Sequence, residues 1–126
     1  MTTFLITGGC GFIGSHTCLS LLKKGYDLII FDSNINSSQN VLGRIYKIGH
    51  IENNHYENQI TFIKGDIRNY ELLKKIFIDA IHKKKPISGV IHFAGLKAVE
   101  ESVKNPLLYW ENNVFGSINL FTVMKL

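Results

Sequence analysis

The sequence has little cysteine, little proline and no long hydrophobic run. Its two cysteines, Cys10 and Cys18, are spaced neither as a CxxC pair nor as zinc ligands, and its five histidines are scattered, so we predict neither disulfides nor a metal site. No apolar segment approaches the roughly 18 residues of a membrane helix, and the N-terminus lacks the basic and apolar regions of a signal peptide. We therefore expect a cytoplasmic protein that does not bind membranes.

Charge also excludes a class of partner. The net charge of +4 is spread along the chain, and the single basic run, residues 83–85, falls where a helix should end and where cations are favourable. We therefore expect no nucleic-acid binding. With 126 residues, 45% of them hydrophobic, the chain has the size and composition of one domain with one core.

Strand-like and helix-like segments alternate along the chain. Apolar residues recur at three- and four-residue spacing between four short apolar segments, residues 4–7, 28–31, 60–64 and 90–93. The pattern predicts four βα units. Strands this apolar, without polar alternation, are typical of a parallel sheet covered by helices on both faces. We expect a Rossmann-type, doubly wound α/β domain over residues 1–126, with strand order 3-2-1-4, that is incomplete because no fifth strand follows.

The helix ends carry local signals. Gly25 is placed for a left-handed stop after a helix over residues 11–24. Asn69 is a good N-cap for a helix that reaches about residue 84, and Pro86 prevents its continuation. Asn105 followed by Pro106 predicts the start of the fourth helix. The segment 37–59 is less regular, and we expect a helix there over about residues 40–48.

Four glycines cluster where the first strand turns into the first helix. Gly8, Gly9, Gly11 and Gly14 satisfy both GxxGxxG and GxGxxG. A dinucleotide pyrophosphate at this place would meet free backbone N–H groups and the positive end of the helix dipole, provided that no side chain keeps it away. The strand before and the helix after the glycines favour dinucleotide binding over the alternative, a merely structural tight turn.

Acidic and small residues end the other predicted strands. Asp32 is close to the spacing expected for an acid that binds the adenosine ribose and repels a 2′-phosphate, which favours NAD over NADP, although it could also cap a turn. Asp66 and Ile67 could hold the adenine, with turn formation as the alternative for Asp66. Ala94 and Gly95 would leave room for the cofactor.

With these residues assembled, the chain resembles the extended short-chain dehydrogenase/reductase superfamily, and within it the UDP-glucose 4-epimerases. The segments that carry the resemblance are TGGCGFIGSHT, FDSNINSS, GDIRN and VIHFAGLKAVEESVKNPLLYWENNVFGS. The resemblance implies that Phe12 and Ile13 lie under the pyrophosphate and that Asn36 and Ser37 join Asp32 at the adenosine. It also implies an NAD site completed by Gly8, Gly11, Gly14, Asp66, Ile67, Phe93, Ala94, Gly95, Lys97 and Asn112. Ser33 replaces an Asn that is usual in this family, so its ribose contact departs from the pattern.

The resemblance further implies the reaction and the part of it that is missing. In the family, NAD takes a hydride from C4 of a UDP-sugar and returns it to the other face, with a Tyr of a Y-x-x-x-K motif as base. The one such motif here, Tyr70 to Lys74, directly follows GDIRN on the adenine side, so we expect no catalytic residue in this chain. We expect the NAD-binding half of a UDP-glucose/UDP-galactose 4-epimerase, possible as a homodimer at full length. The alternatives are another NAD-dependent nucleotide-sugar enzyme, either a dehydratase or another 4-epimerase, and a non-catalytic NAD-binding remnant.

Overall fold

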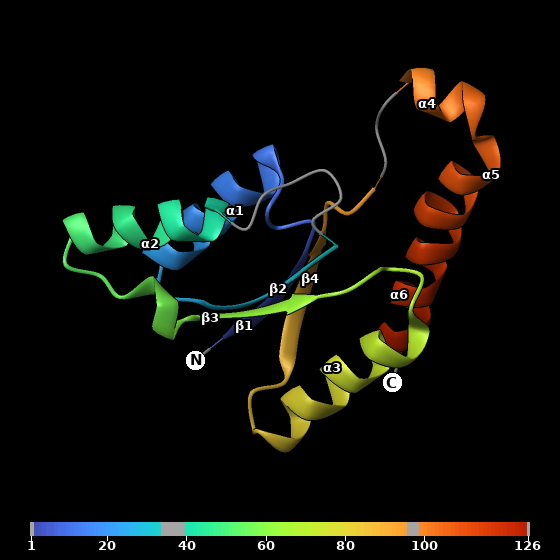
Figure 1. Ribbon diagram of the computed structural model, residues 1–126. Helices are drawn as coiled ribbons and strands as arrows, with labels where there is room; N and C mark the ends of the chain where they lie inside the picture. The colour runs from blue at the N-terminus through green and yellow to red at the C-terminus, as the bar shows by residue number, and fades with distance from the viewer. Residues whose placement is uncertain (1, 34–39, 96–98, 126) are drawn as a thin grey trace.

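A four-stranded parallel sheet forms the centre of the fold (Figure 1). The computed structural model describes residues 2–33, 40–95 and 99–125. The strands are ordered β3-β2-β1-β4, as predicted, and are β1 (Thr3–Thr7), β2 (Asp27–Asp32), β3 (Ile60–Lys64) and β4 (Ile87–His92). From β1 the chain builds the sheet outward through β2 to β3 and then crosses over to place β4 on the other side of β1. This change of direction confirms the doubly wound arrangement.

Helices cover both faces of the sheet. α1 (Phe12–Lys23) and α2 (Asn40–Ile51) pack on one face, and α3 (Tyr70–His82) and α6 (Gly116–Met124) pack on the other (Figure 1). Each helical layer forms a hydrophobic core cluster with the sheet, the first under α1 and α2 and the second under α3 and α6. Successive residues of β1 point to opposite faces, so Ile6 belongs to the first cluster and Leu5 to the second. Both are fully buried. No helix in residues 2–33, 40–95 and 99–125 is long and apolar enough to cross a membrane.

Burial differs between the inner and outer strands. β1 and the carboxyl half of β2 are almost entirely buried, as the apolar segments predict. β3 and β4 are only half-buried, although residues of both strands pack into the core clusters on the two faces of the sheet. Each of these two strands has one neighbour in the described sheet, which leaves its other edge uncovered.

The predicted helix ends are right in part. Gly25 follows α1 with a φ of 86°, and the Asn69 side chain accepts a hydrogen bond from the Leu72 N–H at 3.1 Å at the start of α3. α3 ends at His82, earlier than predicted, and Lys84 takes a left-handed φ of 58° after it. Asn105 stands at an N-cap as predicted, but its side chain makes no capping hydrogen bond.

The C-terminal helical segment is more divided than the sequence predicts. A short helix, α4 (Val99–Lys104), precedes α5 (Pro106–Tyr109), and a π-helical turn, η2 (Trp110–Phe115), separates α5 from α6. Figure 1 shows α5 and α6 as parts of one column, and its α6 end packs with α3 in the second core cluster. A short 3₁₀ helix, η1 (Tyr56–Asn58), also precedes β3. The π turn carries no propensity signal of its own, because its residues are compatible with an α-helix.

Candidate functional site

The carboxyl ends of the strands meet through backbone hydrogen bonds. The Gly8 N–H donates to the Phe31 carbonyl at 2.8 Å, and the Phe93 N–H donates to the Thr7 carbonyl at the same distance. The Gly65 N–H, after β3, donates to the Asp32 carbonyl at 3.1 Å. The predicted site segments after β1, β2, β3 and β4 therefore lie side by side at one edge of the sheet, where open parallel sheets bind ligands.

The glycine turn is too tight for side chains. Gly8 has a φ of 70°, and a Cβ added there would lie 2.7 Å from the Ala94 nitrogen. A Cβ on Gly14 would lie 2.3 Å from the Gly8 carbonyl oxygen. Gly11 is the N-cap of α1 with an extended backbone and no capping side chain. The N-terminus of α1, where Phe12 begins the helix and Ile13 is 57% exposed, is thus left bare.

Asp32 lies against this turn. Its Oδ2 accepts a hydrogen bond from the Cys10 N–H at 3.0 Å, and the residue is 8% exposed. Burial, reinforced by the Asp32 charge, raises the pKa of the Cys10 thiol to about 12, so the thiol stays protonated at neutral pH. A protonated thiol is a poor nucleophile, so this environment does not activate Cys10. Ser33, which follows Asp32 after the end of β2, is half-buried.

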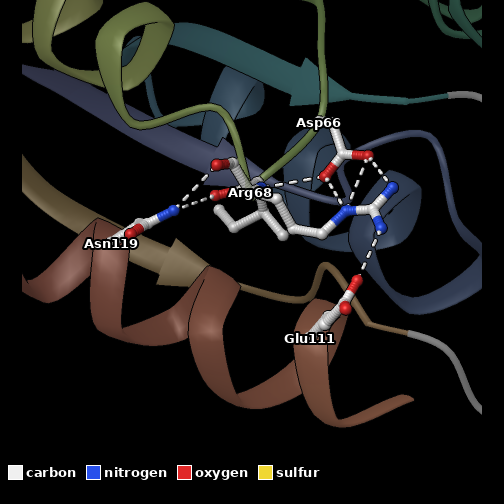
Figure 2. A network of polar contacts seen from close by, with 5 residues as sticks. Asp66, Arg68, Glu111 and Asn119 are labelled. Carbon is white, nitrogen blue, oxygen red and sulfur yellow. Dashed lines mark hydrogen bonds and ion pairs between the residues drawn. The ribbon is translucent and has the colours of Figure 1, made fainter. Parts of the chain in front are cut away.

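Asp66 is held by an arginine that sequence reasoning missed (Figure 2). Its carboxylate accepts from the Arg68 Nε at 3.0 Å and from Nη2 at 2.6 Å, and these bonds lower the pKa of Asp66. Arg68 also reaches Glu111 at 3.5 Å. The Asn119 amide donates to the carbonyls of Ile67 and Arg68 at 3.4 and 2.9 Å, so α6 fixes the loop that follows β3 (Figure 2). A basic residue two positions after the acid was the available sequence signal.

A chain of hydrogen bonds runs behind the segment Phe93 to Gly95. The Ala94 N–H donates to the Thr7 Oγ1 at 3.3 Å, and Thr7 Oγ1 lies 2.5 Å from the His92 Nδ1. The His92 Nε2 lies 2.9 Å from the Ser117 Oγ, which donates to the Asn113 carbonyl at 2.7 Å. Because that hydroxyl has one hydrogen, the His92 Nε2 must donate and Nδ1 must accept from Thr7. Burial lowers the pKa of His92 in keeping with this neutral form.

The remaining predicted site residues are Asn112, Asn36, Ser37 and Lys97, whereas Tyr70 was predicted to take no part in catalysis. Asn112 lies in η2 and is half-buried, while its neighbour Asn113, which was not predicted, has its side-chain oxygen 3.4 Å from where a Cβ on Gly95 would stand. Tyr70 packs against the second core cluster at the start of α3. The predicted residues Asn36, Ser37 and Lys97 lie outside the described residues.

Comparison with known proteins gives this arrangement a family. A family model described as GDP-mannose 4,6 dehydratase matches residues 5–126. A UDP-glucose 4-epimerase of Klebsiella pneumoniae is 46% identical over 121 residues, 96% of this chain and 78% of that protein. The chain belongs to the family of that model, together with the UDP-glucose 4-epimerases.

Solved structures of UDP-glucose 4-epimerases share the fold. The enzyme of Stenotrophomonas maltophila, with bound NAD and formylated UDP-arabinopyranose, has a TM-score of 0.82 and 37% identity, over 99% of this chain and 34% of that one. The enzyme of Bifidobacterium longum, in complex with NAD+ and UDP, has a TM-score of 0.81 and 41% identity, over 98% and 33%. A Neisseria meningitidis UDP-glucose 4-epimerase is 49% identical over 95% of this chain. The chain spans about a third of the length of such relatives, 32% for this last one.

Proposed function

We propose that this chain forms the NAD-binding half of a UDP-glucose 4-epimerase. The observation that carries the proposal is the start of α1, where Gly11 is an N-cap without a side chain and Gly14 packs too closely on the Gly8 carbonyl to carry one. The Asp32 carboxylate lies beside this turn, bonded to the Cys10 N–H. This is the geometry that a dinucleotide pyrophosphate and ribose require. The structures of the Stenotrophomonas and Bifidobacterium enzymes, which contain NAD, support the assignment.

The described residues suggest how each part of NAD would be held. The backbone N–H groups of Phe12 and Ile13 would bind the pyrophosphate at the start of α1. Asp32 would accept hydrogen bonds from the adenosine ribose. The adenine would lie beside Ile67 and the Asp66 carboxylate, which Arg68 holds ionised and fixed in direction.

The other end of the cofactor would run along the end of β4. Phe93, Ala94 and Gly95 would line the path to the nicotinamide, because the Thr7–His92 hydrogen bonds fix this backbone and Gly95 has no side chain. Bound NAD would accept a hydride from the sugar and return it. Within the same proposal, residues 1–126 form one NAD-binding domain without the catalytic base. The remaining contacts to NAD would come from Ser33, Asn36, Ser37, Lys97 and Asn112.

Cofactor binding is tested by exchanging the Asp32 charge. Asp32→Asn keeps an oxygen for the Cys10 N–H but loses the charge-assisted bond to ribose, which is worth roughly 1.5–3 kcal/mol. Calorimetry on the full-length protein should show about ten- to hundredfold weaker NAD binding and a smaller preference for NAD over NADP. Asp27→Asn, at the amino end of the same strand, is the matched control and should bind NAD like the parent. Equal affinity of the parent for NAD and NADP would defeat the assignment.

The reaction is tested with UDP-galactose. An epimerase converts it to UDP-glucose, which has the same mass, and the two isomers separate by chromatography. The family model's description favours a second candidate, a nucleotide-sugar dehydratase, whose product would have lost one water and is distinguished by mass spectrometry. NAD binding without either product would favour a non-catalytic remnant.

A further inference from the structure

Two of the scattered histidines come together on the surface with a glutamate. His50 is in the last turn of α2, His55 precedes η1, and Glu57 lies within η1. The Glu57 Oε1 lies 2.8 Å from the His50 Nε2 and 3.5 Å from the His55 Nδ1, and the three possible ligand atoms all lie within 4.8 Å of one another. All three side chains are open to solvent, with the His55 side chain 69% exposed.

We propose that His50, His55 and Glu57 bind a divalent transition-metal ion, with zinc as the expected occupant. Imidazole nitrogens and a carboxylate oxygen at bond lengths of about 2.0–2.1 Å around a tetrahedral ion lie roughly 3.3 Å apart. The observed separations from the Glu57 oxygen, 2.8 and 3.5 Å, bracket this value. Small side-chain rotations at an exposed surface would complete the geometry, and water would take the fourth position.

The backbone already holds the three ligands in place. The Asn54 N–H donates to the Gly49 carbonyl at 2.7 Å, and the Asn53 N–H donates to the His50 carbonyl at 3.1 Å. Tyr56, which lies between His55 and Glu57 in the sequence, is 1% exposed. Its ring packs on Gly49 so closely that a Cβ added to Gly49 would lie 2.7 Å from it. The loop between α2 and η1 is thus anchored beneath the cluster, so metal binding need order only side chains.

Both imidazoles approach the same carboxylate oxygen. The Glu57 Oε1 lies near the His50 Nε2 and the His55 Nδ1, and the two imidazole rings have their centroids 5.5 Å apart. Two imidazole nitrogens and a carboxylate oxygen that face one point are a ligand set that zinc accepts.

This site would be separate from the proposed cofactor site. The ligands lie between the C-terminal end of α2 and the start of β3, hence at the amino edge of the sheet, whereas the glycine turn and Asp32 lie at the carboxyl edge. The ion would clamp α2 to the segment that enters β3. Its presence does not depend on the proposed function.

The experiment is a calorimetric titration of the purified, metal-free full-length protein with zinc chloride, at a pH above 7 in a weakly coordinating buffer. We expect one zinc ion per chain, with at least about tenfold weaker binding for His50→Ala and for His55→Ala. His82→Ala, a solvent-exposed histidine at the end of α3, is the matched control and should bind zinc like the parent. Far-ultraviolet circular dichroism checks that each variant is folded.

A second measurement uses cobalt, whose visible absorption reports its coordination. Tetrahedral absorption bands that appear with the parent and with His82→Ala, and disappear with His55→Ala, would support the site. No zinc binding by the parent at millimolar metal would overturn the proposal. So would zinc binding that persists unchanged in the folded double variant His50→Ala/His55→Ala, because the ligands would then lie elsewhere.

Discussion

Replacement of Gly14 by alanine should destabilise the fold because α1 packs directly on the glycine turn. The added Cβ would lie 2.3 Å from the Gly8 carbonyl oxygen and 3.0 Å from the Gly9 Cα. Ordinary contacts begin at 3.4 Å, so helix and turn must separate by about an ångström. Overpacking of this kind costs about 1–3 kcal/mol, and backbone atoms that cannot rotate away favour the upper end. Alanine regains about 1 kcal/mol of helix propensity, which leaves a net loss of about 2 kcal/mol.

The chain contains a control for this substitution. Gly43 lies within α2, and a Cβ added there meets no atom within 4 Å. Gly43→Ala should therefore increase the free energy of unfolding by about 0.5–1 kcal/mol. Urea unfolding followed by circular dichroism measures both variants, which should differ by about 3 kcal/mol. Equal stabilities would show that α1 does not depend on the contact between Gly14 and Gly8.

Two further predictions concern a helix cap and a histidine. Asn69→Ala should lose about 1 kcal/mol of stability with the hydrogen bond from the Leu72 N–H, whereas Asn105→Ala, where no capping bond is made, should change stability by less than about 0.5 kcal/mol in urea unfolding. Burial lowers the pKa of His92 in the folded protein below the 6.5 of the unfolded chain. The stability that neutral His92 contributes is therefore fully present above pH 6.5 and is lost as the pH falls toward the pKa of the folded state. His92→Gln should therefore make the unfolding free energy depend less on pH between pH 7 and 5, with a change in slope of at most about 1.4 kcal/mol per pH unit. An unchanged slope would show that His92 is not held neutral by burial.

The first half of the site was predictable because its signals are local. The glycines, the strand before them and the helix after them are contiguous, and Asp32 ends the next strand, so pattern and topology suffice to bring them together. The strand order followed from the same rule. Asp66 could be placed at the edge of the sheet, but its direction could not, because that depends on the Arg68 rotamer and on contacts from η2 and α6.

What escaped prediction depends on the conformation of a loop and on the position of each strand in the sheet. The approach of His55 and Glu57 to His50 requires a loop in which Asn53 has a left-handed φ of 61° and Tyr56 is buried, and neither feature is visible in the spacing of the ligands. The half-buried state of β3 and β4 likewise reflects which strands have two neighbours. An apolar composition alone does not distinguish a central strand from an outer one.

The π turn η2 sets the phase of the helix that follows it. Each residue of an α-helix advances the side-chain direction by about 100°, so the one extra residue that a wide turn holds rotates everything beyond it by that angle. With this offset, Gly116 meets Ile67 and Leu120 is buried against the sheet, although both follow a segment that began in α5. The turn therefore fixes the rotation of α6 relative to α5. Asn113 lies beside Gly95 after the end of β4, and the apolar face of α6 packs against α3.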